Sequence, residues 1–164
     1  KSNNIQLAIC LVKKNPLETI FQKATELGVN KIIPLISERT EVKDINYERA
    51  KKIVIEATEQ SNQLIPPTIY KITKLKNFLE SLDQSTKLLF ADINSKNNLD
   101  IKDLKEVKSL CVLIGPEGDF TPKERETILS RTNTIPFSLS NNILRADTAT
   151  ISAISLINFA LSEH

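Results

Sequence analysis

Histidine is nearly absent from this chain of 164 residues, since its single copy is His164, the last residue. This scarcity excludes histidine-based catalytic triads, histidine metal sites and ordinary histidine acid–base chemistry. Glycine is also scarce, because only three occur, and two of them, Gly115 and Gly118, share one short segment. The chain has neither a Gly-x-Gly-x-x-Gly pattern nor a Gly-Lys-Ser/Thr loop, so we do not expect a Rossmann or P-loop nucleotide site.

Cysteine and long apolar runs are few as well. Cys10 and Cys111 lie within apolar, strand-like stretches, which predicts buried thiols rather than a disulfide or a metal site. No apolar run approaches membrane-spanning length and the first residues show no signal-peptide pattern, so we expect a cytoplasmic protein without membrane contacts. Methionine is absent even at position 1, and we therefore expect the C-terminal portion of a longer protein.

The remaining composition is that of an ordinary folded domain. Hydrophobic residues make up 40% of the chain and charged residues 26%, and a single domain over residues 1–164 can bury a substantial core. The formal net charge of +2 permits nucleic-acid binding but provides no strongly basic surface.

The most structured stretch covers residues 109–122, with the sequence SLCVLIGPEGDFTP. Its apolar first half predicts a strand buried on both faces. Its end predicts a helix that Thr121 caps, with Pro122 in the first turn and Glu124 completing a capping box. The glycines in between predict a shaped loop, and loops after the carboxyl ends of strands bind ligands in α/β sheets. A tight turn without a ligand is the alternative.

Strand and helix patterns alternate along the whole chain, which predicts an α/β fold with a mainly parallel sheet. Pro34 is acceptable near an edge or bulge of that sheet. Short apolar runs predict strands at residues 5–12, 31–37, 69–72, 87–91, 110–114 and 134–139. Capped or amphipathic stretches predict helices at residues 15–27, 46–64, 74–82, 122–131 and 147–161. Asn15 would cap the first helix, and Leu64 would face inward from the second.

A second chemistry-bearing stretch covers residues 139–149, which join the last predicted strand to the last helix. Arg145 and Asp147 are charged neighbours of an otherwise apolar helix, and they predict a functional site. Asp147 or Thr148 as a helix cap, with Arg145 as a surface ion partner of Asp147, explains them equally well. A third polar stretch, residues 56–61, fits either a site or the solvated face of a helix.

These stretches together resemble the RsmE family of ribosomal RNA uridine N3-methyltransferases, which belong to the SPOUT class. Residues 114–120 (IGPEGDF) and 143–149 (ILRADTA) are similar to the family's two C-terminal motifs. Three upstream stretches resemble its other signatures in the same order, namely residues 21–28 (FQKATELG), 37–39 (SER) and 56–61 (EATEQS). The resemblance covers nearly the whole chain.

The resemblance implies a mainly parallel α/β sheet flanked by helices with a C-terminal trefoil knot, which topology rules alone would not predict. It implies S-adenosylmethionine as cofactor, a homodimer, no metal, and methylation of N3 of a uridine in 16S ribosomal RNA of the small subunit. It also implies an N-terminal PUA-like RNA-binding domain, which we expect to be absent from residues 1–164. Two alternatives stay open: a ribose 2′-O-methyltransferase of the same class, and a non-catalytic RNA-binding or ribosome-assembly module.

For a reaction of this kind, chemical reasoning assigns roles to single residues. Arg145 would stabilise negative charge on the uracil oxygens, and Asp147 would accept the N3 proton. Arg39 would contact the RNA, although a structural ion pair explains it as well. The cofactor would bind Ile114, Gly115, Pro116, Glu117, Gly118, Leu139, Ile143, Leu144, Thr148 and Ala149.

The chain departs from the family pattern at four places. Asp119 replaces a usual second glycine, and residues 140–142 (SNN) replace Gly-Pro-Arg. Both departures alter the predicted cofactor loops. Ala146 and Asp147 stand for Thr-Glu, which keeps the carboxylate, and Gln63 stands where arginine is common, which weakens one expected RNA contact.

Overall fold

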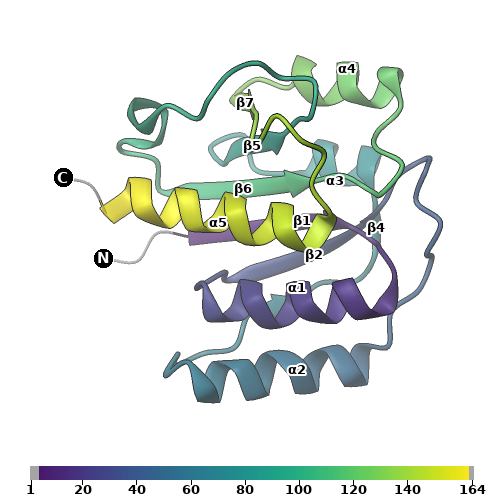
Figure 1. Ribbon diagram of the computed structural model, residues 1–164, viewed down its shortest axis with the longest axis vertical. Helices are drawn as coiled ribbons and strands as arrows, with labels where there is room; N and C mark the ends of the chain where they lie inside the picture. The colour runs from purple at the N-terminus through teal and green to yellow at the C-terminus, as the bar shows by residue number, and fades with distance from the viewer. Residues whose placement is uncertain (1–3, 163–164) are drawn as a thin grey trace.

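A single sheet of seven strands organises the computed structural model, which describes residues 4–162 (Figure 1). Its order is β3-β2-β1-β6-β5-β7, with β4 also paired to β2, and every pairing is parallel. The strands are β1 (Asn4–Cys10), β2 (Lys31–Ile36), β3 (Thr68–Ile69), β4 (Thr73–Lys74), β5 (Lys87–Ala91), β6 (Ser109–Ile114) and β7 (Thr134–Phe137). The predicted parallel α/β sheet is confirmed.

Helices cover both faces of this sheet. One face carries α1 (Lys14–Glu26), α2 (Tyr47–Gln60) and α5 (Ala146–Ser162), and the other carries α3 (Leu75–Ser81) and α4 (Pro122–Ser130). A short 3₁₀ turn, Ile101–Leu104, interrupts the connection from β5 to β6. No helix within residues 4–162 is both long enough and apolar enough to cross a membrane.

Strand β6 lies between β1 and β5 and is buried on both faces, as predicted. Leu110, Val112 and Ile114 pack toward α1 and α5, whereas Cys111 and Leu113 pack toward α3 and α4. Cys10 and Cys111 are free, buried thiols, and burial raises the pKa of each to about 12. The prediction of buried thiols rather than a disulfide is therefore confirmed.

Two predicted helix ends are wrong. Helix α1 begins at Lys14 after an N-cap residue, Lys13, that makes no side-chain cap, so Asn15 lies inside the first turn rather than capping it. Pro16 fits there because residues of the first turn have no helical partner for an N–H group. Helix α2 ends at Gln60, and Leu64 is 95% exposed instead of facing inward.

The predicted strand at residues 69–72 is split in two. Strands β3 and β4 flank residues 70–72 and pair with opposite ends of β2. Pro34 lies between those two ends of β2. Because neither β3 nor β4 pairs with β2 at this gap, no hydrogen bond is lost through the absence of an N–H group on proline.

The path from β7 to α5 defines the carboxyl-terminal edge of the sheet. Within the described residues, β7 is an edge strand that pairs with β5 alone, and it ends at Phe137 instead of the predicted residue 139. Residues 138–145 then cross the carboxyl ends of the neighbouring strands. Helix α5 follows on the face of the sheet opposite α3 and α4, where it packs beside α1 and β6 (Figure 1). The trefoil knot remains a prediction.

Candidate functional site

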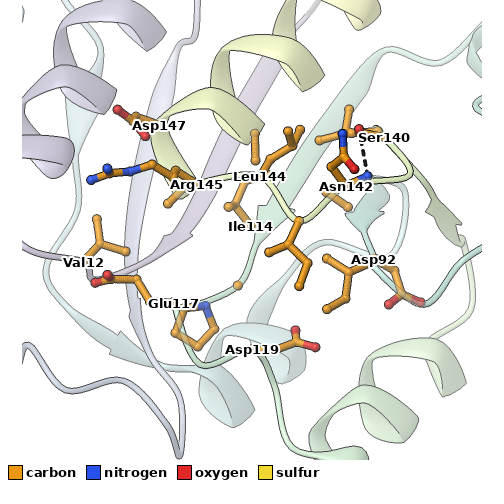
Figure 2. Close-up of a pocket in the computed structure, with 18 of the residues that line it drawn as sticks. Val12, Asp92, Ile114, Glu117, Asp119, Ser140, Asn142, Leu144, Arg145 and Asp147 are labelled. Atoms are coloured by element: carbon orange, nitrogen blue, oxygen red, sulfur yellow. Dashed lines mark hydrogen bonds between the residues drawn. The ribbon is translucent and has the colours of Figure 1, made fainter.

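A cavity of about 290 Å³ opens at the carboxyl edge of the sheet, between the segments that leave β5, β6 and β7 (Figure 2). Ligands of parallel α/β sheets bind at this edge because the strand-to-helix loops converge there. The cavity is lined by Val12, Pro16, Ala91, Asp92, Ile93, Ile114, Gly115, Pro116, Glu117, Asp119, Ser138, Leu139, Ser140, Asn142, Ile143, Leu144, Arg145, Ala146, Asp147 and Ala149.

The loop after β6 owes its shape to contacts within itself. Thr121 and Glu124 exchange the two hydrogen bonds of a capping box, which fixes the start of α4 as predicted. The backbone N–H of Asp119 donates to the Pro116 carbonyl at 2.9 Å, which closes a turn. A Cβ on Gly115 would lie 3.0 Å from the Phe120 ring, so the glycine is needed for packing of this ring.

Gly118 and Arg39 face one another outside the cavity lining. Arg39 donates from Nη1 to the Gly118 carbonyl at 3.2 Å, and a Cβ on Gly118 would make an ordinary 3.6 Å contact with Arg39. Beside them, the Glu38 N–H donates to Oε2 of Glu124 at 3.0 Å. The turn after β2 therefore braces the loop after β6, and Gly118 lies against this turn rather than in the cavity.

The loop after β7 brings Arg145 and Asp147 to the cavity. Helix α5 begins at Ala146, so Asp147 and Thr148 are inside its first turn and the prediction that either caps the helix is wrong. Oδ1 of Asp147 is buried without a hydrogen-bond partner, and within residues 4–162 Arg145 forms no ion pair. The surface ion pair expected between them is also absent from this part of the chain.

Eight of the ten predicted cofactor-binding residues line the cavity, and Gly118 and Thr148 do not. Ile143 exposes 83% of its surface at the cavity mouth, an unusual position for a large apolar side chain unless a ligand or partner covers it. Backbone groups of the loop after β6 lie beside Leu139, Ile143 and Leu144. Such a mixture of apolar walls and a few polar groups is typical of small-molecule sites.

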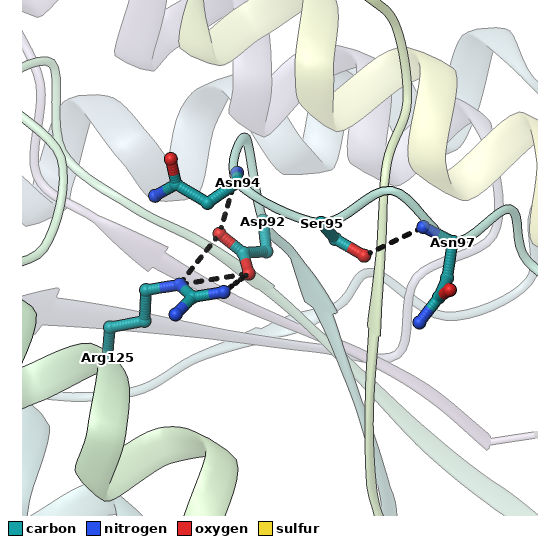
Figure 3. Close-up of polar contacts among 5 residues, drawn as sticks. All are labelled: Asp92, Asn94, Ser95, Asn97 and Arg125. Carbon is teal, nitrogen blue, oxygen red and sulfur yellow. Dashed lines mark hydrogen bonds and ion pairs between the residues drawn. The ribbon is translucent and has the colours of Figure 1, made fainter.

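The sequence interpretation missed Asp92, which lies directly after β5 and lines the cavity. Its side chain is 1% exposed and pairs with Arg125 of α4 at 2.7 Å (Figure 3). The carboxylate also accepts the Asn94 N–H at 3.0 Å. These bonds satisfy the buried charge and hold the pKa of Arg125 above its usual range. The sequence offered one signal for this residue, since Asp92 is a charged side chain directly after the apolar run of β5.

The comparisons with known proteins agree with this geometry. Residues 1–158 match the model of the RNA methyltransferase domain. The chain belongs to this family. Ribosomal RNA small subunit methyltransferase E of Rickettsia conorii is 38% identical over 158 residues, which cover 94% of this chain and 64% of that protein. The homologous methyltransferase E of Aquifex aeolicus is 36% identical and is covered to 63% of its length. The chain thus spans less than two thirds of these relatives.

A solved structure extends the family likeness to three dimensions. Ribosomal RNA small subunit methyltransferase E of Neisseria gonorrhoeae, bound to S-adenosyl methionine, superposes with a TM-score of 0.86 at 29% identity. The match covers 96% of this chain and 68% of that one. The RNA methyltransferase fold therefore extends over nearly all of this chain.

Proposed function

We propose that this domain transfers a methyl group from S-adenosylmethionine to N3 of a uridine in 16S ribosomal RNA. The observation that carries the proposal is the cavity at the carboxyl edge, where both motif loops converge. Similarity to methyltransferase E proteins, one of them bound to S-adenosyl methionine, supports the choice of cofactor and RNA. The cofactor supplies an electrophilic methyl group on a sulfonium.

The residues present fit this cofactor. Leu139, Ile143 and Leu144 would enclose the adenine, and Ala149 would add to the same apolar lining. Backbone groups of residues 114–117 and 139–144 would bond the adenine edge and the ribose. Ile114 and Pro116 complete the apolar lining. We place Gly118 and Thr148 outside the contact surface, because they do not line the cavity.

The uracil N3–H is a weak acid, so the site must stabilise the anion that attacks the methyl group. Arg145 is exposed at the cavity and unpaired within the described residues, and it would bind the uracil oxygens as negative charge develops on them. Asp147 would accept the proton at its unpartnered Oδ1. The new N3–C bond forms as the C–S bond breaks, and the sulfonium becomes a neutral thioether.

Contacts beyond the cavity belong to the same proposal. Arg39 is exposed beside the cofactor loop and would bind RNA phosphate. Leu156 and Phe159 are exposed on α5, and a homodimer that buries them fits this face. We further propose that residues 1–164 form one methyltransferase domain that works in the cytoplasm beside a PUA-like RNA-binding domain. The greater length of the relatives supports this arrangement.

The test begins with calorimetric titration of S-adenosylhomocysteine into the chain. Ile143→Ser should weaken binding about tenfold, because an apolar contact of one aliphatic side chain is lost. Ile65→Ser is a matched control, since Ile65 is 81% exposed and does not line the cavity. The full-length protein should then label unmethylated small ribosomal subunits, with N3-methyluridine found by nucleoside mass spectrometry. Absence of binding, or a ribose-methylated product, would contradict the proposal.

A further inference from the structure

The charges that line the cavity do not balance. The charged side chains of the lining are Asp92, Glu117, Asp119, Arg145 and Asp147. Asp92 is neutralised by its ion pair with Arg125. Within residues 4–162 the remaining groups form no ion pairs, so three carboxylates, those of Glu117, Asp119 and Asp147, face one guanidinium. The cavity therefore carries excess negative charge.

Asp119 holds its carboxylate there at a conformational cost. Its φ of +64° lies in the left-handed region, where side chains other than glycine are disfavoured and Asp is among the better tolerated. Its side chain makes no hydrogen bond or ion pair within the described residues, so only the backbone bond to Pro116 supports this conformation. An uncommon backbone conformation at a cavity wall is the kind of outlier that signals function.

The negative charge of Asp119 affects the pKa of two neighbouring groups, Arg125 and Cys10. The hydrogen bonds that Arg125 donates to Asp92, together with the charges of Asp92 and Asp119, raise the pKa of Arg125. Burial, with smaller contributions from Glu124 and Asp119, raises the pKa of Cys10 to about 12. Figure 2 shows Asp119 on the same side of the cavity as Glu117 and Asp92. With Arg125 occupied by Asp92, the charge of Asp119 is free to act on a bound ligand.

We propose that Asp119 makes the cavity prefer a cationic ligand, so that the sulfonium cofactor binds more tightly than its neutral thioether product. This inference rests on the proposed function. S-adenosylmethionine and S-adenosylhomocysteine differ by one methyl group and one positive charge, and the ratio of their affinities therefore measures the electrostatic preference of the cavity. Loss of the charge in the reaction would then assist release of the product.

The experiment compares both ligands on the parent chain and on Asp119→Asn. Asparagine tolerates the left-handed conformation as aspartate does, so this change removes the charge and keeps the shape. We expect the parent to bind S-adenosylmethionine more tightly and the variant to lose about threefold of that preference, as expected for one charge pair screened by solvent. The preference of the parent should also shrink as salt concentration rises.

Glu126→Gln is the matched control, because Glu126 is exposed on α4 and does not line the cavity. It removes the same charge and should leave the affinity ratio unchanged. Binding of both ligands with an unchanged ratio in Asp119→Asn would overturn this inference alone. A folded parent that binds neither ligand would overturn the proposed function and this inference with it.

Discussion

At the amino-terminal edge of the sheet, Arg131 donates four hydrogen bonds to backbone carbonyls, those of Asp83, Thr86, Thr132 and Asn133, at 2.8 to 3.2 Å. At the carboxyl edge, the Arg145 side chain forms no ion pair within residues 4–162, and Oδ1 of Asp147 is buried without a partner. Arg131 directly follows α4, and Arg145 directly precedes α5. The difference lies in what the surrounding backbone offers them.

Helix α4 joins these two edges of the sheet. The capping box of Thr121 and Glu124 joins its first turn to the loop after β6, and its end passes to Arg131 at the opposite edge. Burial lowers the pKa of Arg131, and only its Nε lacks a partner. The bonded guanidinium of Arg131 stabilises the fold, whereas the guanidinium of Arg145, which forms no ion pair within residues 4–162, remains available to a ligand.

The largest expected effect is on catalysis at the carboxyl edge. Arg145→Ala should lower methyl transfer about a hundredfold or more, because a group that stabilises developing negative charge is lost. Its free energy of unfolding should stay within about 0.5 kcal/mol of the parent, since no bond within the described residues is broken. Methyl incorporation into small subunits and urea unfolding measure the two quantities. Arg49→Ala, at an exposed arginine of α2, is the control, and full methylation by Arg145→Ala would refute the assigned role.

At the amino edge the same substitution should act on stability instead. Arg131→Ala should lower the free energy of unfolding by about 2–3 kcal/mol, because several charge-assisted bonds to partly buried carbonyls are lost. Affinity for S-adenosylhomocysteine should not change below the unfolding transition. Arg131→Lys should recover only part of the loss, since one ammonium cannot reach all the carbonyls. If Arg131→Ala instead weakened binding of S-adenosylhomocysteine and left the free energy of unfolding unchanged, Arg131 would serve ligand binding rather than stability.

A third comparison stays within the carboxyl edge and uses its two glycines. Gly115→Ala should cost about 1–3 kcal/mol and weaken cofactor binding, because the new methyl group would press on the Phe120 ring. Gly118→Ala should be nearly neutral, since its methyl group meets Arg39 at ordinary contact distance. Thermal unfolding and calorimetry measure both effects. Phe120→Leu added to Gly115→Ala should relieve the clash. Equal effects of Gly115→Ala and Gly118→Ala would show that contact with Phe120 does not determine the stability of the loop.

Local signals in the sequence predicted most of the fold. The capping box at Thr121 was predicted correctly because both of its bonds join residues three apart. The apolar run of β6 was sufficient for a doubly buried strand. The Asn15 cap was wrong because the helix begins earlier, and Leu64 was misplaced because the chain turns at Asn62, with a φ of +59°, before the predicted end of α2.

The site was harder to predict, since its members meet only in the folded chain. The motif loops could be recognised, yet nothing local indicated that Gly118 turns toward Arg39 instead of the cavity. The pair of Asp92 and Arg125 joins residues 33 positions apart on different elements. Tertiary ion pairs of this kind have no local pattern, so a single sequence shows the charged residues but not their pairing.

The smallest effect tests whether the same backbone conformation has different consequences at the two edges. Asp119 and Asn133 both have positive φ, of +64° and +65°. Asp119→Gly should raise the free energy of unfolding by about 1 kcal/mol, because glycine adopts this conformation without strain and no side-chain bond is lost. Asn133→Gly should gain less or nothing, since Nδ2 of Asn133 donates to the Gln84 carbonyl at 3.2 Å and that bond disappears. Urea unfolding measures both changes in the free energy of unfolding. Equal gains at both positions would mean that the hydrogen bond from Asn133 to Gln84 does not stabilise the amino edge.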